Sequence, residues 1–233
     1  GRILGPALAG ILLLISYTAP FYLFALGALF VIFLITKQES PPLLTRKEDL
    51  KKISLFDNRV WPFLIVSASF GVCNAALVQT SSFYFQDVID PGSTNYIALA
   101  SIGFMLSALG ILNGQLLIAD RLQTSPGSLI RLGILFIVFS LLGVASSSSL
   151  VHIYISLFFY GLGGGMLGPG ISASLSLSVG KENQGSASGF LGMVIPIGHV
   201  ISPIISMPLY TINPSYPYLL GSSLMLFCLI FVL

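Results

Sequence analysis

Long apolar runs, separated by short polar breaks, make up most of the chain. A helix that crosses a membrane needs about 20 apolar residues, because the hydrocarbon core is about 30 Å thick. Runs near this length lie at residues 1–17, 19–36, 61–84, 94–118, 127–147, 150–178, 184–209 and 215–233. Backbone groups in lipid must be hydrogen-bonded within the segment, so each run is expected to be helical. The pattern predicts an all-α integral membrane protein with about eight transmembrane helices.

The segment at residues 37–60 differs from these runs. Its sequence, KQESPPLLTRKEDLKKISLFDNRV, holds most of the charged residues of the chain and a Pro-Pro pair. Charge and consecutive prolines are typical of a connection in water, so we interpret the segment as a solvated linker. It separates the two helices predicted at 1–36 from the six predicted at 61–233.

Positive charge lies on one side of the predicted membrane. The Lys and Arg residues of the linker and of the two later loops on its side are Lys37, Arg46, Lys47, Lys51, Lys52, Arg59, Arg121, Arg131 and Lys181. The connections on the opposite side, around residues 17–19, 85–94, 146–150 and 210–216, carry no Lys or Arg. Cytoplasmic loops of membrane proteins are enriched in these residues. The asymmetry predicts a multi-pass protein of the cell membrane (inner or plasma), with the linker and the C-terminus in the cytoplasm.

Composition excludes several classes of protein. Charged residues make up 8% of the chain, against about 25% in soluble domains. The net charge of +2 gives no basic face for nucleic acid. Cys73 and Cys228 lie inside apolar runs, and we expect buried free thiols. The sequence has no pattern of a metal site, a cofactor site or a catalytic triad. A membrane-embedded lipid-modifying enzyme is a weaker alternative, because it would need His, Asp or Glu clustered near an interface.

One sequence pattern occurs twice. The first run has Gly-Arg-x-x-Gly-Pro at residues 1–6, and the seventh has Gly-His-x-x-Ser-Pro at residues 198–203. The same offset of 197 residues aligns Pro20 with Pro217, each near the start of the next predicted helix. Four predicted helices lie between the two hairpins, so the repeating unit would have six helices.

The repeat predicts the organisation of the whole protein. Residues 1–36 would be the last helix hairpin of an N-terminal half, and residues 61–233 a complete C-terminal half. The intact protein would then have twelve helices in two pseudo-symmetric halves, joined by the linker at 37–60. This is the arrangement of a parallel-repeat transporter.

The first ten residues resemble a motif of a known family. Gly1, Gly5, Pro6, Ala9 and Gly10 resemble the GxxxGPxxGG motif in the fifth helix of the drug:proton antiporter branch of the major facilitator superfamily. Ala9 stands where that motif has glycine. In the family this motif is associated with packing of the two halves and with a block on leakage. The resemblance implies the same gate-like role here, and ordinary close packing of helices is the alternative.

Three further segments resemble the same family. ADRL at 119–122 resembles the loop motif between helices eight and nine, without the glycine of that motif. KENQGSASG at 181–189 resembles the turn before helix eleven, and DNRVWP at 57–62 resembles the beginning of helix seven. The resemblance extends over the whole chain. It implies a membrane transporter of the major facilitator fold, with a small molecule as its substrate.

Polar and flexible positions inside the predicted helices are candidates for a substrate cavity. Asn74 and Gln79 are uncharged amides in the third run, where they would either line a cavity or bridge two helices. Gly163, Gly164 and Pro169 belong to a glycine-rich segment of the sixth run. Such a segment is poor for a helix interior in water. It would form either a deformable cavity wall or a packing groove.

Ionisable residues suggest two further roles. Asp120, Arg121 and Glu182 lie in cytoplasmic loops and are candidates for an inner gate, with solvated loop charge as the alternative. His199 is the one ionisable residue well inside a predicted span, and histidine changes charge near physiological pH. It is a candidate for proton coupling. A neutral histidine bonded to a neighbouring hydroxyl or carbonyl group is the alternative.

These features together suggest a secondary active transporter that works by alternating access. The resemblance favours export of a small amphipathic or hydrophobic compound in exchange for protons, by a protein embedded in the lipid bilayer. A transporter-like protein with an uptake or receptor role is the main alternative. We expect no enzyme activity, no metal, no cofactor and no nucleic-acid partner.

Overall fold

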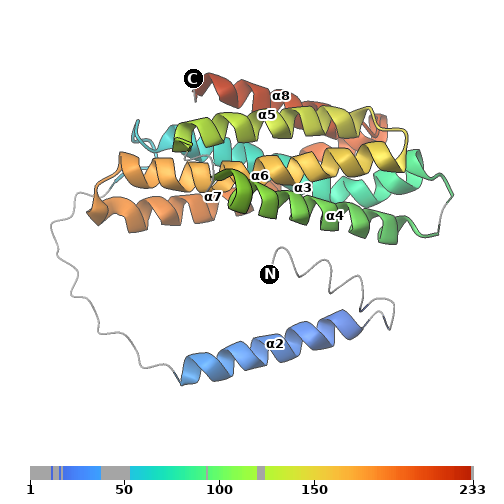
Figure 1. Ribbon diagram of the computed structural model, residues 1–233, viewed down its shortest axis with the longest axis horizontal. Coiled ribbons are helices and arrows are strands. Elements are labelled where there is room, and N and C mark those ends of the chain that lie inside the picture. Colours follow the sequence, from blue (N-terminus) through green and yellow to red (C-terminus); the bar gives the residue numbers. More distant parts are fainter. Residues whose placement is uncertain are drawn as a thin grey trace. The chain divides into compact units, whose positions relative to one another are not determined.

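The computed structural model describes Leu12, Ser16 and residues 18–37, 53–92, 94–119 and 124–231. The chain divides into two units, Gly1–Lys51 and Lys52–Leu233, and each is described by itself (Figure 1). Apart from Leu12 and Ser16, the helix predicted at 1–17 lies outside these ranges.

The described helix of the first unit is α2, Ala19–Thr36, in agreement with the prediction. Pro20 lies in its first turn, where the missing N–H group breaks no helical hydrogen bond. Pro20 is also the one buried residue of this helix. The other side chains of α2 are almost all apolar, so this helix is suited to a hydrocarbon environment.

The described part of the second unit contains six α-helices, and each coincides with a predicted run. They are α3 (Trp61–Tyr84), α4 (Tyr96–Asn113), α5 (Pro126–Ala145), α6 (Leu150–Ser178), α7 (Gln184–Ile212) and α8 (Tyr216–Cys228). Short π-helical or 3₁₀-helical segments adjoin them at Phe85–Ile89, Gly114–Ala119, Lys181–Asn183 and Leu229–Phe231.

The fold class predicted from the sequence is confirmed. No strand occurs in the ranges that the structure describes, and six of the helices there, α2 to α7, are long and apolar enough to cross a membrane. The apolar helix at Tyr216–Phe231 is shorter.

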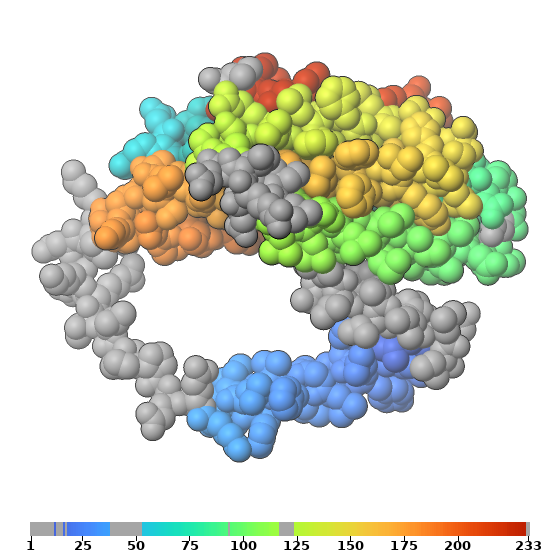
Figure 2. Space-filling model, in the orientation of Figure 1, coloured from blue at the N-terminus to red at the C-terminus, as the bar shows by residue number. Residues whose placement is uncertain are grey.

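The helices of the second unit form two groups of three. α6 packs mainly on α4 and α5, whereas α3 packs mainly on α7 and α8. Contacts between α5 and α8 join the two groups. α5 and α6 lie side by side on the face seen in Figures 1 and 2. The core between the groups is apolar, and Ile134, Leu157 and Met225 are each no more than 1% exposed in it.

Hydrogen bonds between helices supplement this apolar packing. Thr80 Oγ1 in α3 donates to the carbonyl oxygen of Ala76 at 2.7 Å, and it is hydrogen-bonded to the hydroxyl group of Tyr218 in α8 at 2.9 Å. Ser140 Oγ in α5 donates to the carbonyl oxygen of Ser156 in α6 at 2.7 Å. Such bonds inside a membrane protein contribute about 0.6 kcal/mol each. They therefore fix the register of neighbouring helices more than they add stability.

Two opposite faces of α6 are lined by glycine, because the neighbouring backbones leave no room for a side chain. A Cβ atom on Gly163 would lie 2.7 Å from the carbonyl oxygen of Gly133 in α5. On the other face, Gly161 packs directly on the backbone of Ser107 in α4. Small residues are the usual means by which membrane helices approach closely. The glycine-rich segment of α6 thus holds α4 and α5 on either side.

The close contact of Gly163 predicts the effect of a single methyl group. Gly163→Ala should destabilise the protein by about 1–3 kcal/mol, the usual cost of overpacking a well-packed site. Gly168→Ala is the matched control in the same helix, because no atom lies within 4 Å of a Cβ at that position. It should leave stability unchanged or raise it slightly, since alanine favours helix more than glycine does. Thermal unfolding of both purified variants in detergent tests this, and equal melting temperatures would refute it.

Candidate functional site

α3 and α7 cross in direct backbone contact near the middle of both helices. A Cβ atom on Gly198 would lie 2.7 Å from the carbonyl carbon of Gly71, and one on Gly71 would lie 3.0 Å from the carbonyl oxygen of Ile195. One turn further, Ser202 Oγ donates a hydrogen bond to the carbonyl oxygen of Val72 at 3.1 Å. We call this contact the α3–α7 crossing. It fixes the depth at which the residues next to both glycines lie.

Phe70, directly before Gly71, brings α6 to the same place. Its ring stacks on that of Tyr160, with 6.2 Å between the ring centroids and 23° between the ring planes. A Cβ atom on Gly164 would lie 3.4 Å from the edge of the Phe70 ring. Gly164 thus leaves space for the aromatic ring, on a face of α6 different from those that hold α4 and α5.

Asn74 and His199 both lie within one helical turn of the α3–α7 crossing. Asn74 follows Gly71 by three residues and is half-buried, while His199 directly follows Gly198 and is exposed. The crossing therefore sets an amide and an imidazole at about one level along the two helices. We call Phe70, Asn74, Gly164 and His199 the crossing site.

The hydrogen bond of His199 indicates its protonation pattern. Its Nδ1 lies 3.1 Å from the carbonyl oxygen of Ile195, one turn earlier in α7. A carbonyl oxygen only accepts hydrogen bonds, so Nδ1 carries the hydrogen of this bond. In the neutral ring Nε2 is then the nitrogen that accepts a hydrogen bond or a proton. The bond to Ile195 is the carbonyl hydrogen bond expected if His199 is a neutral structural histidine. Proton coupling stays a prediction, because Nε2 has a lone pair in this tautomer.

The other cavity candidates lie elsewhere. Gln79 lies two turns beyond Gly71 along α3, and its Oε1 is buried with no hydrogen-bond partner among the described residues. Gly163 faces α5 rather than Phe70. Pro169 is half-buried, further along α6 toward its C-terminal end. Asn74 and His199 thus lie near the level of the crossing and Gly164 packs on Phe70, whereas Gln79, Gly163 and Pro169 lie elsewhere.

Phe70 was not among the residues predicted from the sequence. Many aromatic residues occur in the apolar runs, so residue type alone does not single it out. The spacing of Phe70 and Asn74, four residues apart on one face of a helix, is a signal that could have indicated it. No group of three or more His, Cys, Asp or Glu side chains in the described ranges could hold a metal ion.

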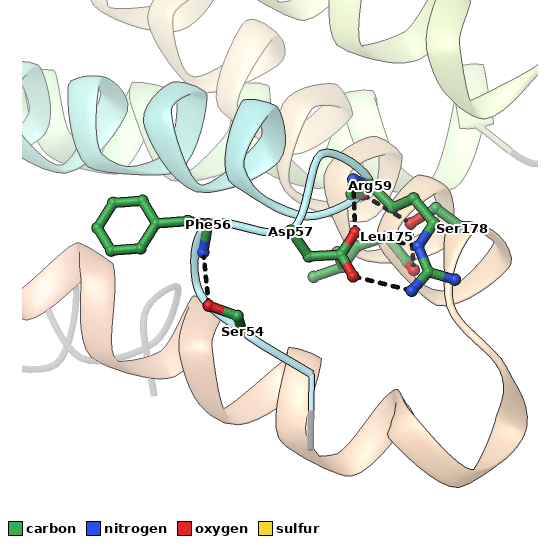
Figure 3. Close-up of polar contacts among 6 residues, drawn as sticks. All are labelled: Ser54, Phe56, Asp57, Arg59, Leu175 and Ser178. Carbon is green, nitrogen blue, oxygen red and sulfur yellow. Dashed lines mark hydrogen bonds and ion pairs between the residues drawn. The ribbon is translucent and has the colours of Figure 1, made fainter. Parts of the chain in front are cut away.

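The beginning of α3 is held to the end of α6 on the side that carries the linker (Figure 3). Ser178 Oγ donates hydrogen bonds to the carbonyl oxygens of Arg59, at 3.0 Å, and Leu175, at 2.9 Å. The Asp57 carboxylate accepts bonds from the backbone N–H of Arg59 and from two of its guanidinium nitrogens, at 2.8–3.0 Å. This turn directs the chain from the linker into α3.

The same bonds alter the acidity of Asp57. The side-chain hydrogen bond from Arg59, followed by the backbone one, lowers the pKa of Asp57 from 3.8 to about 2. Both bonds stabilise the ionised carboxylate and not the neutral acid. The ion pair is the only one in the described ranges.

The predicted gates are only partly described. Glu182 is exposed in the short helix Lys181–Asn183, and its carboxylate packs on Gly180. Nearby, Gln184 Nε2 donates to the carbonyl oxygen of Ser176 at 3.3 Å. The inner-gate residues Asp120 and Arg121 lie outside the described ranges. So do the antiporter-motif residues Gly1, Gly5, Pro6, Ala9 and Gly10. Both gates stay predictions.

Comparison with known proteins gives one clear result. The sequence model of a family described as Major Facilitator Superfamily matches residues 1–203 and, in a second match, residues 117–233. The two matches together extend over the whole chain. A search of curated proteins found no match.

The lowered pKa of Asp57 predicts a pH dependence with a definite sign. Because the pKa is depressed in the folded protein, the Asp57–Arg59 contribution to stability is complete above the unfolded pKa of about 4. It should be lost as pH falls from about 4 to about 2. Asp57→Asn should therefore lower the melting temperature slightly at pH 7, and the difference from the unmodified chain should shrink toward pH 3.

Thermal unfolding across this pH range measures the effect. Asp90→Asn serves as the control, since Asp90 is exposed and forms no ion pair within the described part of the chain. A difference for Asp57→Asn that stays constant from pH 7 to pH 3 would show that the carboxylate charge is not responsible.

Proposed function

Because the chain belongs to the major facilitator superfamily of membrane transporters, we propose that it is a secondary active transporter working by alternating access. Its substrate is a small amphipathic or hydrophobic compound, which it exports in exchange for protons. The crossing site is where the substrate binds, and His199 is where a proton binds.

The observation that carries this proposal is the pair Asn74 and His199 at the α3–α7 crossing. An ionisable residue inside a membrane helix is costly and is by default a candidate for function. Transporters bind their substrates near the middle of the bilayer, and the crossing lies near the middle of both helices. Phe70, which packs on Gly164, supplies an apolar surface on the same face of α3 as the amide. An amphipathic molecule matches this combination.

α7 has the features of a moving element. Pro196, Pro203 and Pro208 lie inside it, and each removes one backbone hydrogen bond of the helix. Beyond Pro196 in the N-terminal direction, Gly185, Gly189 and Gly192 have no neighbouring atom within 4 Å of a Cβ position. The C-terminal part of α7 is held to α3 at Gly198 and Ser202. We therefore propose that the N-terminal part of α7 bends about Pro196 to open and close the crossing site.

The organisation of the protein follows from the internal repeat. In this proposal residues 61–233 are one six-helix half of a twelve-helix transporter, and residues 1–36 are the last hairpin of the other half. The linker at 37–60 lies in the cytoplasm. Residues 1–10 pack the halves together, and Asp120, Arg121 and Glu182 close the cytoplasmic side.

Transport by the reconstituted intact protein, with the twelve helices of this proposal, tests it. Lipid vesicles containing the protein would be loaded with a fluorescent amphipathic cation, ethidium, and a pH gradient would be imposed. Exchange for protons predicts ethidium movement against the direction of proton flow, faster than in protein-free vesicles. Ethidium movement that does not depend on the pH gradient would contradict proton coupling. Ethidium movement in the same direction as the protons would indicate uptake. No protein-dependent flux of ethidium or of a neutral hydrophobic dye would contradict the transport of such compounds.

Replacing His199 separates proton coupling from substrate binding. His199→Gln keeps a polar side chain that hydrogen-bonds but does not take up a proton near neutral pH. Flux driven by the pH gradient should fall about tenfold or more, an effect of roughly 1.4 kcal/mol. Exchange of labelled for unlabelled ethidium without a gradient should persist. His152→Gln, an exposed histidine at the first turn of α6, is the matched control and should behave like the unmodified chain.

Replacing Asn74 tests substrate binding at the crossing. Asn74→Leu keeps the branched shape and the number of side-chain heavy atoms and removes one hydrogen-bonding group, worth about 0.5–1.5 kcal/mol. The ethidium concentration at half-maximal flux should rise about twofold to tenfold. Gln79→Leu, an amide in the same helix away from the crossing, should change it little. An equal effect of both substitutions would argue against the crossing site.

A further inference from the structure

A small cavity lies between α3, α7 and α8, separate from the crossing site. Its lining includes Val72, Cys73 and Ala76 of α3, Ser202 and Ser206 of α7, and Gly221 of α8. Its volume is about 20 Å³. One water molecule needs about 10–15 Å³ of such space. The cavity is therefore large enough for one water molecule and too small for an organic ligand.

Ser206 places a polar group in the wall of this otherwise mostly apolar cavity. Its side chain is 3% exposed, and its Oγ has no hydrogen-bond partner among the described residues. The buried hydroxyl group of Ser222, by contrast, bonds to its own helix at the carbonyl oxygen of Leu219, at 2.8 Å. A buried hydroxyl group without a partner is costly, so its presence in the cavity wall points to a ligand that hydrogen-bonds.

A second polar group lies in the same wall. Ser202, 0% exposed, uses its hydrogen for the bond to the carbonyl oxygen of Val72, and its oxygen can still accept a bond. Cys73 Sγ donates to the carbonyl oxygen of Gly221 at 3.4 Å. The cavity thus offers neutral groups that donate and accept, and no charged side chain lines it.

From these contacts we propose that the cavity binds one water molecule, held by Ser206 Oγ and Ser202 Oγ. A bound cation is the poorer match, since Ca²⁺ or Mg²⁺ takes about six or more oxygen ligands and a compensating negative charge. The water lies one turn from the α3–α7 crossing, in the space between α7, α3 and α8. The water is the hydrogen-bond partner of Ser206 Oγ, which has none among the described residues of the three helices. This proposal does not depend on the transport function.

Radiolytic labelling of the full chain in lipid nanodiscs tests the proposal directly. Hydroxyl radicals formed from a bound water molecule oxidise the side chains beside it, and thiols oxidise readily. Cys73 lines the cavity, whereas Cys228 does not, and they are 1% and 0% exposed. Cys73 should be oxidised several-fold more than Cys228 after a short X-ray pulse. Equal oxidation, or none at Cys73, would overturn the proposal.

A substitution gives a second and independent test. Ser206→Ala removes a partner of the water and should lower the melting temperature by about 2–4 °C, the shift expected when one such bond is lost. It should also lower the oxidation of Cys73 and not that of Cys228. Ser223→Ala, an exposed serine in α8, should change neither value. If Ser206 faces a dry cavity, Ser206→Ala removes an unpaired hydroxyl and the melting temperature rises or stays constant, which contradicts the proposal.

Discussion

In hydrocarbon, helices gain no hydrophobic driving force from packing on one another, so van der Waals contact between their surfaces has to hold the bundle together. The second unit meets this constraint with glycine at the places where its helices cross. Gly163 and Gly133 join α6 to α5, and Gly71 and Gly198 join α3 to α7. One hydrogen bond between helices, that from Ser202 to Val72, lies one turn from the contact of Gly71 and Gly198.

The α3–α7 crossing shows how packing creates a site. Where two backbones touch, the side chains next to the contact cannot lie between the helices and are directed to its edges. Asn74 and His199 are brought to one level in this way, although more than a hundred residues separate them in the sequence. Phe70 adds α6 to the same level through Gly164. A rigid contact thus positions polar groups in a region with few of them.

Much of the fold could be predicted from the sequence, and the faces of its helices could not. The apolar runs indicated the described helices to within a few residues, because a membrane span requires both length and low polarity. The sequence could not tell that Gly163 packs on α5 whereas Gly164 packs on Phe70. Adjacent positions of a helix point about 100° apart, and the sequence does not say which neighbouring helix each of them contacts. Asn74 and Gln79 looked equivalent as amides in one run, but five residues of helix place them on different faces. Phe70 was overlooked because its contact with Tyr160 depends on how α3 and α6 pack.

The lengths of α6 and α7 have a consequence for the membrane itself. Each has 29 residues and is roughly 43 Å long at 1.5 Å per residue. The hydrocarbon core is only about 30 Å thick, so both helices have to tilt, bend or extend beyond it. Their internal prolines provide places to bend. The thickness of the surrounding bilayer therefore acts on the shape of α7, and lipids with longer or shorter acyl chains would favour different degrees of bending at the same three prolines.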